Sequence, residues 1–405
     1  MEVEWFRGQV VFLTGVTGNL GGCLLFKLAT QLPTAKIFVL VRGSVQRTLE
    51  VWEQSMPEQV EDVISTGKIQ FLLGDMTRPN LGLSSETVSR LCSEVNVVIN
   101  AAGDIALSRE LEETMPINCI AHLTLAALLD SFTQLQRFLH ISTTYATSFL
   151  PDGVVKEQIY PLYEDPGEEL KKILVTGKST YTKRFAAPYA MAKHLAECLL
   201  SNGDHKFPIL IVRPCLISPA IEDPYPLYGS DGAIPAHSFI QILLKDSEYG
   251  PLQLEKGLPS QVTSNEIPVD LVARVCLAHV AQGTTGVVHA SADLYIPRTI
   301  GDLLGLMHRY APPGSVDRIR KAGIDQGDTT APEFFNMIQR FARDWKIECV
   351  RSAHLKKLPG PLGLDLGDHD PEDFFRRRTE RLAKALFEKL ENATQAASKF
   401  HPNMS

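Results

Sequence analysis

Tyr189 and Lys193 are the residues of this sequence best suited to moving a proton. Their i, i+4 spacing places a phenol and an ammonium group on one face of a helix. A nearby cation lowers the pKa of a phenol from about 10 toward neutrality, which makes it a usable proton donor or acceptor. The same spacing also arises by chance, with a packed Tyr beside a solvated Lys, so the other features of the chain decide its meaning.

Hydroxyl groups follow an apolar run that lies upstream of this pair. The run ends in the sequence HISTTY, at residues 140–145. A hydroxyl at the end of such a strand could hold the oxygen of a carbonyl substrate as negative charge develops on it. The position along the strand favours Thr143 for this role, with Ser142 as the alternative, and His140 is expected to be a packed strand residue. Thr143, Tyr189 and Lys193 are therefore the candidate catalytic residues.

A glycine-rich segment near the N-terminus, TGVTGNLG at residues 14–21, lies between a strand-like run and a helical pattern. In such a segment Gly15 allows a tight turn, Gly18 lets the backbone approach a pyrophosphate, and Gly21 permits close packing of helix on strand. The helix N-terminus then offers unpaired N–H groups to phosphate oxygens. We therefore expect a dinucleotide site here, formed by Thr14, Gly15, Thr17, Gly18, Asn19, Leu20 and Gly21.

The residue that ends the second strand-like run indicates which dinucleotide this is. An acidic residue there would bind the 2′-hydroxyl of NAD, whereas Arg42 is placed to meet a 2′-phosphate, and Arg47 could assist. This favours NADPH over NADH, although Arg42 could also be a solvated charge. Asp75 is suited to accept a hydrogen bond from the adenine amino group. The other residues expected at the cofactor are Met76, Asn100, Ala101, Ala102, Lys193 and Pro214.

The first two thirds of the chain alternate short apolar runs with longer amphipathic stretches, which is typical of a parallel sheet covered by helices. We therefore expect an α/β fold with a Rossmann-type, doubly wound parallel sheet. The expected strands are Val10–Thr14, Lys36–Val41, Ile69–Leu73, Val95–Asn100, Arg137–Ser142 and Pro208–Arg213. The expected helices among them include Asn19–Gln31, Asn118–Ser131 and one from Pro188 to just before Gly203.

The character of the chain changes after Pro214. Residues 219–235 are rich in proline and should form a loop that roofs the active site. Helices are expected at His237–Leu244, Pro268–Val280, Ile300–Tyr310, Ala331–Trp345 and Pro371–Asn392. The expected division is a cofactor-binding domain of residues 1–214 with about 262–290, and a smaller, mostly helical substrate domain of about 215–261 and 291–405.

Composition narrows the class of protein further. The net charge of -7 over 405 residues, with a pI near 5.9, argues against a nucleic-acid binder. The seven cysteines contain no CxxC spacing and sit among apolar residues, which favours buried free thiols over disulfides or a metal site. The first strand starts too early to leave room for a secretory leader, and no apolar stretch is long enough for a transmembrane helix. We therefore expect a cytoplasmic enzyme without a metal.

With these residues identified, the sequence resembles the extended short-chain dehydrogenases, and among them the fatty acyl-CoA reductases and related thioester reductases. The similarity runs from about Trp5 to His289. It depends on several short segments in a fixed order: FRG at 6–8, VLVR at 39–42, GDMTRPNLGL at 74–83, HISTTY at 140–145, VKEQIYP at 155–161, IVRP at 211–214 and IPVD at 267–270.

The resemblance implies that NADPH reduces an acyl thioester, bound to coenzyme A or to a carrier protein, to an aldehyde or onward to an alcohol. Thr143 and Tyr189 would polarise the thioester carbonyl, and Lys193 would bind the nicotinamide ribose. Asn19 replaces the phenylalanine common in that glycine segment. Residues 290–405 show neither the usual C-terminal domain nor a hydrophobic anchor, which leaves the acyl group, its carrier and the final product open.

Two other functions remain open at this point. A nucleotide-sugar epimerase or dehydratase shares the glycine segment and the Tyr/Lys pair, but Arg42 and the segment at 155–161 disfavour it. A non-catalytic cofactor-binding regulator would have no physical need for an intact Thr143, Tyr189 and Lys193. Residues 171–184 carry five basic residues and no acidic one, so they could meet the phosphates of coenzyme A or a phosphopantetheine arm, or simply be a solvated basic loop.

Overall fold

A seven-stranded parallel sheet forms the centre of the molecule in the computed structural model, which describes residues 2–229, 234, 237, 261–310 and 340–400. The strand order is β10-β7-β5-β4-β1-β2-β3, so the order reverses between β1 and β4. The strands are β1 (Val10–Thr14), β2 (Lys36–Val41), β3 (Ile69–Leu73), β4 (Val97–Asn100), β5 (Arg137–Ile141), β7 (Ile209–Pro214) and β10 (Gly286–Ala290). The expected doubly wound parallel sheet is confirmed.

Continuous apolar runs produce these strands because both faces of the sheet are covered. Every residue of β4 is buried, as are the last four residues of β1 and of β5. Three of the expected strands have the bounds that the sequence predicts, and the others differ by one or two residues at one end or, for β7, by one residue at both ends. The seventh strand, β10, was not expected, and it pairs with β7 from Gly286 beside Leu210 to Ala290 beside Pro214.

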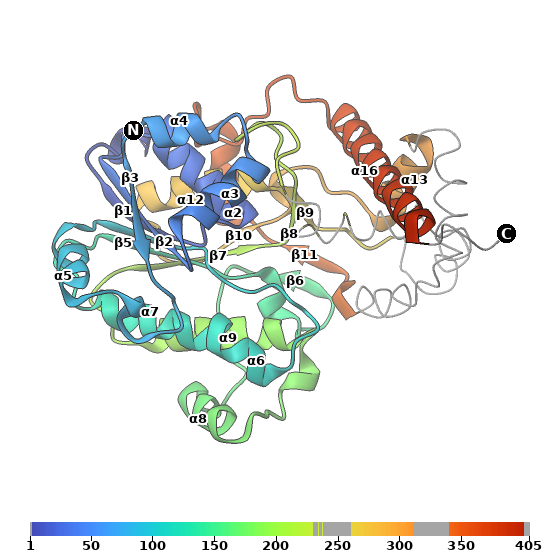
Figure 1. The fold of residues 1–405 in the computed structure, drawn as a ribbon. Coiled ribbons are helices and arrows are strands. Elements are labelled where there is room, and N and C mark those ends of the chain that lie inside the picture. The colour runs from blue at the N-terminus through green and yellow to red at the C-terminus, as the bar shows by residue number, and fades with distance from the viewer. Residues whose placement is uncertain (1, 230–233, 235–236, 238–260, 311–339, 401–405) are drawn as a thin grey trace. The chain divides into compact units, whose positions relative to one another are not determined.

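Helices cover the two faces of the sheet (Figure 1). In that view α2 (Asn19–Phe26), α3 (Val45–Ser55) and α12 (Val269–Gln282) lie on one side, and α6 (Leu111–Met115), α7 (Ala121–Leu129) and α9 (Pro188–Asn202) on the other. The remaining α-helices of this region are α1 (Glu2–Trp5), α4 (Val60–Ser65), α5 (Ser85–Glu94) and α8 (Pro166–Thr176). Two of the expected helices continue into π-helical turns, at Lys27–Gln31 after α2 and at Pro116–Ile120 (η3) before α7.

Short elements complete the described chain. Two small sheets consist of β6 (Gly153–Val155) with β11 (Trp345–Ile347), and of β8 (Leu216–Ser218) with β9 (Glu266–Pro268). The 3₁₀ segments are Pro79–Gly82, Thr144–Thr147 (η4), Thr182–Arg184, Ala292–Leu294 and Val350–Lys357. The expected helix Ala331–Trp345 is wrong at its end, because Trp345 begins β11; its residues 331–339 and most of the expected helix His237–Leu244 lie outside the described residues.

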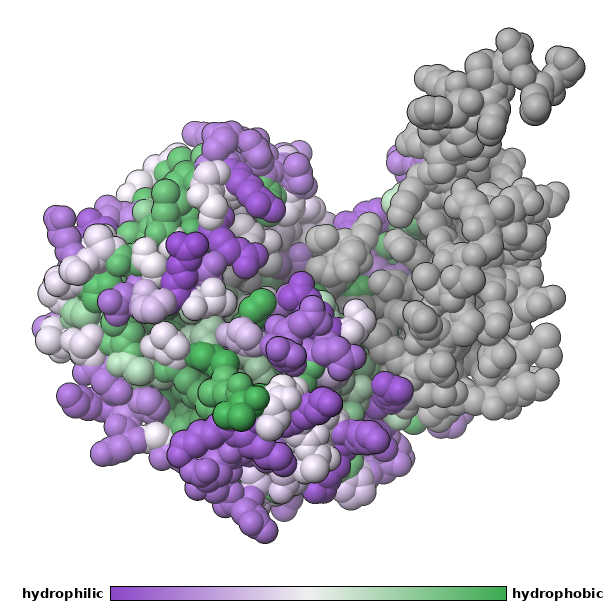
Figure 2. Space-filling view, turned by 60° about the horizontal axis from the view of Figure 1, so that its bottom comes forward, coloured by the Kyte–Doolittle hydropathy of each residue, from purple (hydrophilic) through white to green (hydrophobic). Residues whose placement is uncertain are grey.

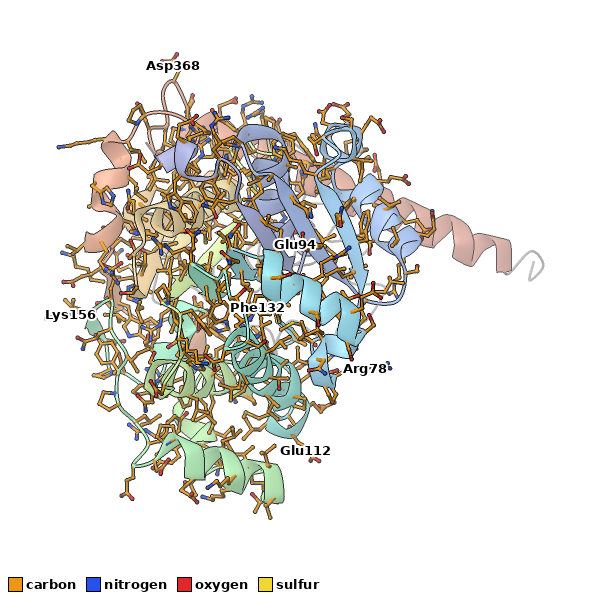
Figure 3. All side chains as sticks on the ribbon, turned by 90° about the vertical axis from the view of Figure 1, so that its left-hand side faces the viewer. Arg78, Glu94, Glu112, Phe132, Lys156 and Asp368 are labelled. Carbon is orange, nitrogen blue, oxygen red and sulfur yellow. The ribbon has the colours of Figure 1, made fainter. Side chains whose placement is uncertain are left out.

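Hydrophobic packing fixes the helices to the sheet. One cluster joins strands and helices around Phe12, Phe38, Leu125 and Phe138, and includes Phe132, which Figure 3 labels inside the layered body. Arg78 and Glu112, labelled in the same view, lie at the periphery. On the face shown in Figure 2, hydrophobic residues form a band that reaches the centre of the coloured surface, and hydrophilic residues lie mostly toward its edges.

The described chain divides into two compact units. Unit 1 comprises residues 1–229, 265–296 and 346–365, and unit 2 comprises 230–264, 297–345 and 366–405. The unit that contains the sheet thus extends beyond residue 214 and takes in a late segment at 346–365. The described part of unit 2 contains α13 (Ile300–Tyr310), as expected, and α16 (Pro371–Phe400), which is longer than predicted.

The first part of the proline-rich loop packs within unit 1, against the helix that follows the glycine segment. The Tyr228 hydroxyl donates to the backbone O of Asn19 at 3.1 Å, and a Cβ on Gly22 would lie 2.3 Å from that hydroxyl. Asp223 pairs with the buried Lys27 at 2.6 Å. Residues 219–229 therefore brace α2, and their continuation at 230–233 lies outside the described residues.

Candidate functional site

Lys193 lies near the middle of α9, and its amine is buried at the carboxyl end of β5. α9 begins at Pro188, a favourable first helical residue, and packs against α7, β7 and η4. Lys193 is only 3% exposed, and its Nζ donates to the backbone O of Ile141 at 3.1 Å. Burial lowers the pKa of this amine to about 8, since desolvation disfavours the charged form.

A chain of buried polar groups connects this amine to the glycine segment. Lys193 Nζ lies 3.3 Å from His122 Nε2, and His122 Nδ1 lies 2.9 Å from the side-chain amide nitrogen of Asn100. The hydroxyl of Thr14 donates to Asn100 Oδ1 at 2.8 Å and accepts from the backbone N–H of Ala102 at 3.2 Å. The structure therefore brings Thr14, Asn100, Ala102 and Lys193 together through a histidine.

Two loops that leave the sheet at its reversal point approach each other closely. Gly15 has φ = 77°, and a Cβ there would lie 2.6 Å from backbone atoms of Ala101 and Ala102. A Cβ on Gly21 would lie 2.0 Å from Gly15 O. No side chain caps the first turn of α2 at Gly18, and a Cβ on Gly18 would meet only Gly15 O, at 3.4 Å. This arrangement leaves helix N–H groups available to a phosphate, as a dinucleotide site requires.

Thr143 and Ser142 follow β5 directly, two residues and one residue after the carbonyl that Lys193 contacts. The Thr143 hydroxyl oxygen accepts from the backbone N–H of Tyr145 at 3.2 Å, so its own proton remains for a substrate oxygen. Ser142 is 4% exposed, and its hydroxyl has no hydrogen-bond partner among the described residues. Both residues directly follow the strand whose last carbonyl accepts from the amine, and both remain candidates.

Tyr189 lies one helical turn before Lys193 and is half-buried. Burial raises its pKa above the ordinary value of a phenol, and the carboxylates of Asp104 and Glu197 act in the same direction. The expectation that Lys193 lowers this pKa is not met in the structure, because the amine contacts Ile141 O and His122 rather than the phenol. A hydroxyl with a raised pKa is protonated at neutral pH and can donate a hydrogen bond to a substrate oxygen.

Arg42 and Asp75 lie near each other at the ends of β2 and β3. Hydrogen bonds from the backbone N–H and the hydroxyl of Thr77 hold the pKa of the Asp75 carboxyl below its usual value, and the charge of Arg42 adds to this. Arg42 is exposed, and Met76 packs at the edge of the core. The residues expected at the adenine end of a dinucleotide therefore all follow the carboxyl ends of β2 and β3. Pro214, at the end of β7, is buried beside Ala290.

Sequence reasoning missed the residues that hold Lys193 and its surroundings in place. His122 was not singled out, and Asn118 was not among the expected catalytic or cofactor residues. The Asn118 side chain accepts from Asp104 N–H at 3.0 Å and donates to Asp104 O at 2.9 Å, which fixes the loop after β4. A Cβ on Gly103 of that loop would lie 3.3 Å from Lys193 Nζ. The sequence signal for His122 was its spacing, because it lies one helical turn after Asn118 and so shares the same helix face.

A buried ion pair fixes the far half of α9. Glu197 and Arg213 are both fully buried, with Arg213 Nε 2.8 Å from Glu197 Oε1 and a guanidinium nitrogen 2.5 Å from Oε2. Arg213 also donates to Gln158 O at 3.0 Å. Because Arg213 is on β7, this pair holds the helix that carries Tyr189 and Lys193 against the sheet.

Within the described residues, no group of His, Cys, Asp and Glu side chains could hold a metal ion. All seven cysteines are unpaired, and six of them are buried, as expected. No helix in the described ranges is both long and apolar enough to cross a bilayer.

Comparison with known proteins places the chain in a family. A family profile described as male sterility protein, an NAD-binding domain, matches residues 13–276. The chain is 30% identical over 242 residues to a putative fatty acyl-CoA reductase of Drosophila melanogaster, which covers 55% of this chain and 46% of that protein. It is 27% identical over 290 residues to fatty acyl-CoA reductase 1 of Xenopus laevis, covering 68% of this chain and 55% of that protein. The chain therefore spans about half the length of these relatives.

Solved structures show the same fold at low sequence identity. The terminal R domain of the myxalamid PKS-NRPS pathway superposes with a TM-score of 0.66 at 17% identity, over 92% of this chain and 90% of that one. The reductase domain of a nonribosomal peptide synthetase from Mycobacterium tuberculosis gives 0.64 at 16% identity, over 94% and 92% of the two chains. The profile match and the strand order agree: the chain belongs to the male sterility protein family, the fatty acyl-CoA-reductase-like group of the extended short-chain dehydrogenases.

Proposed function

We propose that this chain reduces an acyl thioester, bound to coenzyme A or to a carrier protein, with NADPH as reductant. The observation that carries the proposal is the buried amine of Lys193, held by Ile141 O at the end of β5, two residues before Thr143 in sequence and one helical turn after Tyr189. The relatives named fatty acyl-CoA reductases support the substrate class. Arg42 and the segment at 155–161 disfavour the sugar-nucleotide alternative, and a non-catalytic regulator would have no physical need for these three residues.

Side chains of this chain would activate the carbonyl. The hydroxyls of Thr143 and Tyr189 would donate to the thioester oxygen, and Ser142 is the alternative to Thr143. The bound cofactor supplies a hydride. As the carbonyl carbon gains the hydride, Tyr189 gives its proton to the oxygen, which yields a hemithioacetal. The C–S bond then breaks, the oxygen loses its proton, and the sulfur leaves as a thiol with that proton, so that the products are an aldehyde and a free thiol. A second hydride and proton would give the alcohol.

The glycine segment and the loop after β4 fit a dinucleotide. Gly15, Gly18 and Gly21 keep the backbone open around the first turn of α2, where Thr17, Asn19 and Leu20 would flank the pyrophosphate. Thr14 and Asn100 would fix the loop of Ala101 and Ala102, and Lys193 would bind the nicotinamide ribose. Asp75 and Met76 would lie at the adenine, and Pro214 near the nicotinamide.

Arg42 supports NADPH rather than NADH. It is exposed at the end of β2, in the position from which an acidic residue would bind the 2′-hydroxyl of NAD. No acidic residue occupies that end of the strand. Arg42 lies close enough to Asp75 for its charge to lower the pKa of that carboxyl.

An apolar side chain beside the site suits an acyl substrate. Ile105 follows Gly103 and Asp104 in the loop after β4, and it is 55% exposed. A Cβ on Gly103, two residues earlier, would lie 3.3 Å from Lys193 Nζ, so Ile105 would be an apolar contact for the acyl chain. The unpaired cysteines of the chain are consistent with the reducing cytoplasm, which we propose as its location.

The test is an NADPH-oxidation assay over acyl-CoA thioesters of increasing chain length and the same acyl groups on a carrier protein, with aldehyde and alcohol separated. NADH replaces NADPH in a parallel series. We expect aldehyde formation from at least one thioester and a preference for NADPH. Turnover of a sugar nucleotide with no thioester reduced would overturn the proposal.

A further inference from the structure

Among the described residues, no carboxylate pairs with the buried amine of Lys193, which raises the question of what holds it. Its hydrogen-bond neighbours are Ile141 O and the imidazole of His122. His122 is 1% exposed, and burial, with the charge of Lys193, holds its pKa well below its usual range. Because the imidazole stays neutral while the amine titrates, the two groups carry at most one charge, and that charge is on Lys193.

Two arrangements of this network, which differ in the tautomer of His122, satisfy its donors and acceptors. In the first, the Asn100 amide nitrogen donates to Nδ1 of both His122 and His140, at 2.9 and 3.3 Å. His122 then carries its proton on Nε2 and must donate it to a neutral Lys193. In the second, the Asn100 amide is reversed, so that its oxygen accepts from both Nδ1–H groups and its nitrogen donates to Thr14. His122 Nε2 then accepts from the ammonium form of Lys193.

The two arrangements differ by one proton, and that proton is on Lys193. A neutral imidazole can exchange donor and acceptor between its two nitrogens, and an amide can do the same by rotation. The other partner of the amine, the backbone O of Ile141, can only accept a hydrogen bond. We propose that His122 is a positioning residue for Lys193: its Nε2 accepts from the ammonium and donates to the free amine, so the side chain keeps its place in both states.

Other ionisable groups face Lys193 from the elements packed around it. Glu197 on α9 favours the charged amine but is already bound to Arg213. Cys119 on η3 and His140 on β5 are buried and uncharged near neutral pH, since burial raises the pKa of the thiol and lowers that of the imidazole. Among these groups only His122 is within hydrogen-bond distance of the amine.

The proposal makes a prediction about the tautomer of His122 that needs neither cofactor nor substrate. In protein labelled with ¹⁵N-histidine, the His122 signals are assigned by their loss in His122→Gln. Its proton should be on Nδ1 when Lys193 is charged and move to Nε2 as the pH rises through about 8, where the amine titrates. The change should be absent in Lys193→Met. A tautomer that stays constant from about pH 6 to about pH 9.5 in the wild type would overturn the proposal.

The consequence for catalysis rests on the proposed reductase function and is tested separately. His122→Phe removes both nitrogens, so the buried ammonium loses its acceptor and Lys193 should lose its proton at lower pH. We expect the alkaline limb of the kcat/KM profile to move down by about one pH unit, which is a tenfold loss on that limb and little change near pH 6. His122→Gln, whose amide oxygen can accept, should restore most of the profile.

His140→Phe is the matched control, because His140 packs edge-on against His122 at 4.7 Å and also contacts Asn100, but has no hydrogen bond to Lys193. Its alkaline limb should stay where the wild type has it. An equal shift in both phenylalanine variants would show a packing effect and contradict the role of His122. If no thioester is reduced by the wild type, the reductase proposal fails while the tautomer measurement still decides the role of His122.

Discussion

Two buried cations contact α9 or belong to it, Arg213 through Glu197 and Lys193 one helical turn earlier, and their partners differ. Arg213 reaches the helix from β7 and meets the carboxylate of Glu197 in a bidentate pair with both residues fully buried. Lys193, on the helix itself, meets a carbonyl and a neutral imidazole, and no carboxylate lies within ion-pair distance of it among the described residues. The paired charge is permanent and holds the helix to the sheet, whereas the charge with neutral partners is free to titrate at the proposed active site.

Breaking the paired charge should cause the largest loss of stability. Glu197→Gln keeps the shape of the side chain but leaves the Arg213 guanidinium buried without a counter-ion. We expect the free energy of unfolding to fall by about 3–5 kcal/mol. Denaturant unfolding at neutral pH measures it.

The matched control is Glu94→Gln, which removes the carboxylate of the half-exposed Lys36–Glu94 pair (Glu94 is labelled in Figure 3). That change should cost less than about 1 kcal/mol, because water screens the pair. Equal losses in the two variants would remove the distinction between the buried pair and an ordinary surface pair.

Removing the Lys193 amine should affect turnover strongly, and its effect on the free energy of unfolding should depend on pH. Lys193→Met should lower turnover by about 10²-fold, since the amine proposed to bind and orient the nicotinamide ribose is lost. The pKa of Lys193 is held at about 8 in the folded state and near 10.5 in the unfolded state, so the folded wild type carries a penalty that is complete below pH 8 and disappears as the pH rises toward 10.5.

The free energy of unfolding of the wild type should therefore increase relative to Lys193→Met between about pH 7 and about pH 9.5. Unfolding curves at these two pH values measure the difference. A constant difference would mean that the amine titrates in the folded protein as it does in water, which contradicts its burial.

Exposed charge near the cofactor should affect binding more than stability. Arg42→Ala should raise the KM for NADPH about tenfold, as expected for loss of one contact to a phosphate, and change the KM for NADH less than about twofold. Arg78→Ala, on a nearby exposed residue that also acts on Asp75, serves as the control. A matching loss for both cofactors would exclude a contact with the 2′-phosphate.

The smallest effect is expected at the basic segment that follows α8. Lys178, Lys183 and Arg184 are exposed, and neutralising all three should raise the KM for the thioester a few-fold while NADPH binding stays unchanged. Lys171→Gln is the control, because that residue pairs with Glu168 on α8. An unchanged KM in the triple variant would leave the segment as a solvated loop.

The sheet could be predicted from the sequence because buried parallel strands require continuous apolar runs. β1, β2 and β3 have the expected bounds, and the glycine segment lies between β1 and α2 as predicted. β10 was missed because its five residues begin with Gly286 and contain a histidine, so the run looks short and polar. Its partner β7 lies some 76 residues earlier along the chain, as the pairing of Arg213 with His289 shows.

The identity of the candidate residues was easier to predict than their electrostatics. Tyr189 and Lys193 follow from spacing, but the direction of the Tyr189 pKa depends on how deeply the helix is buried and on Asp104, which reaches it from another loop. His122 is 71 residues from Lys193 in sequence, so no local pattern joins them. The polar chain through Asn100 and Thr14 exists only because β1 and β4 are neighbours in the sheet.

The most direct test of the account is the rate of NADPH-driven aldehyde formation from an accepted acyl thioester by the wild type and by Tyr189→Phe. Tyr181→Phe, on a tyrosine packed edge-on against Tyr163, is the matched control. The account predicts that Tyr189→Phe lowers kcat by about 10²–10⁴-fold with unfolding and NADPH binding unchanged, while Tyr181→Phe stays near the wild-type rate. Undiminished aldehyde formation by Tyr189→Phe would contradict it.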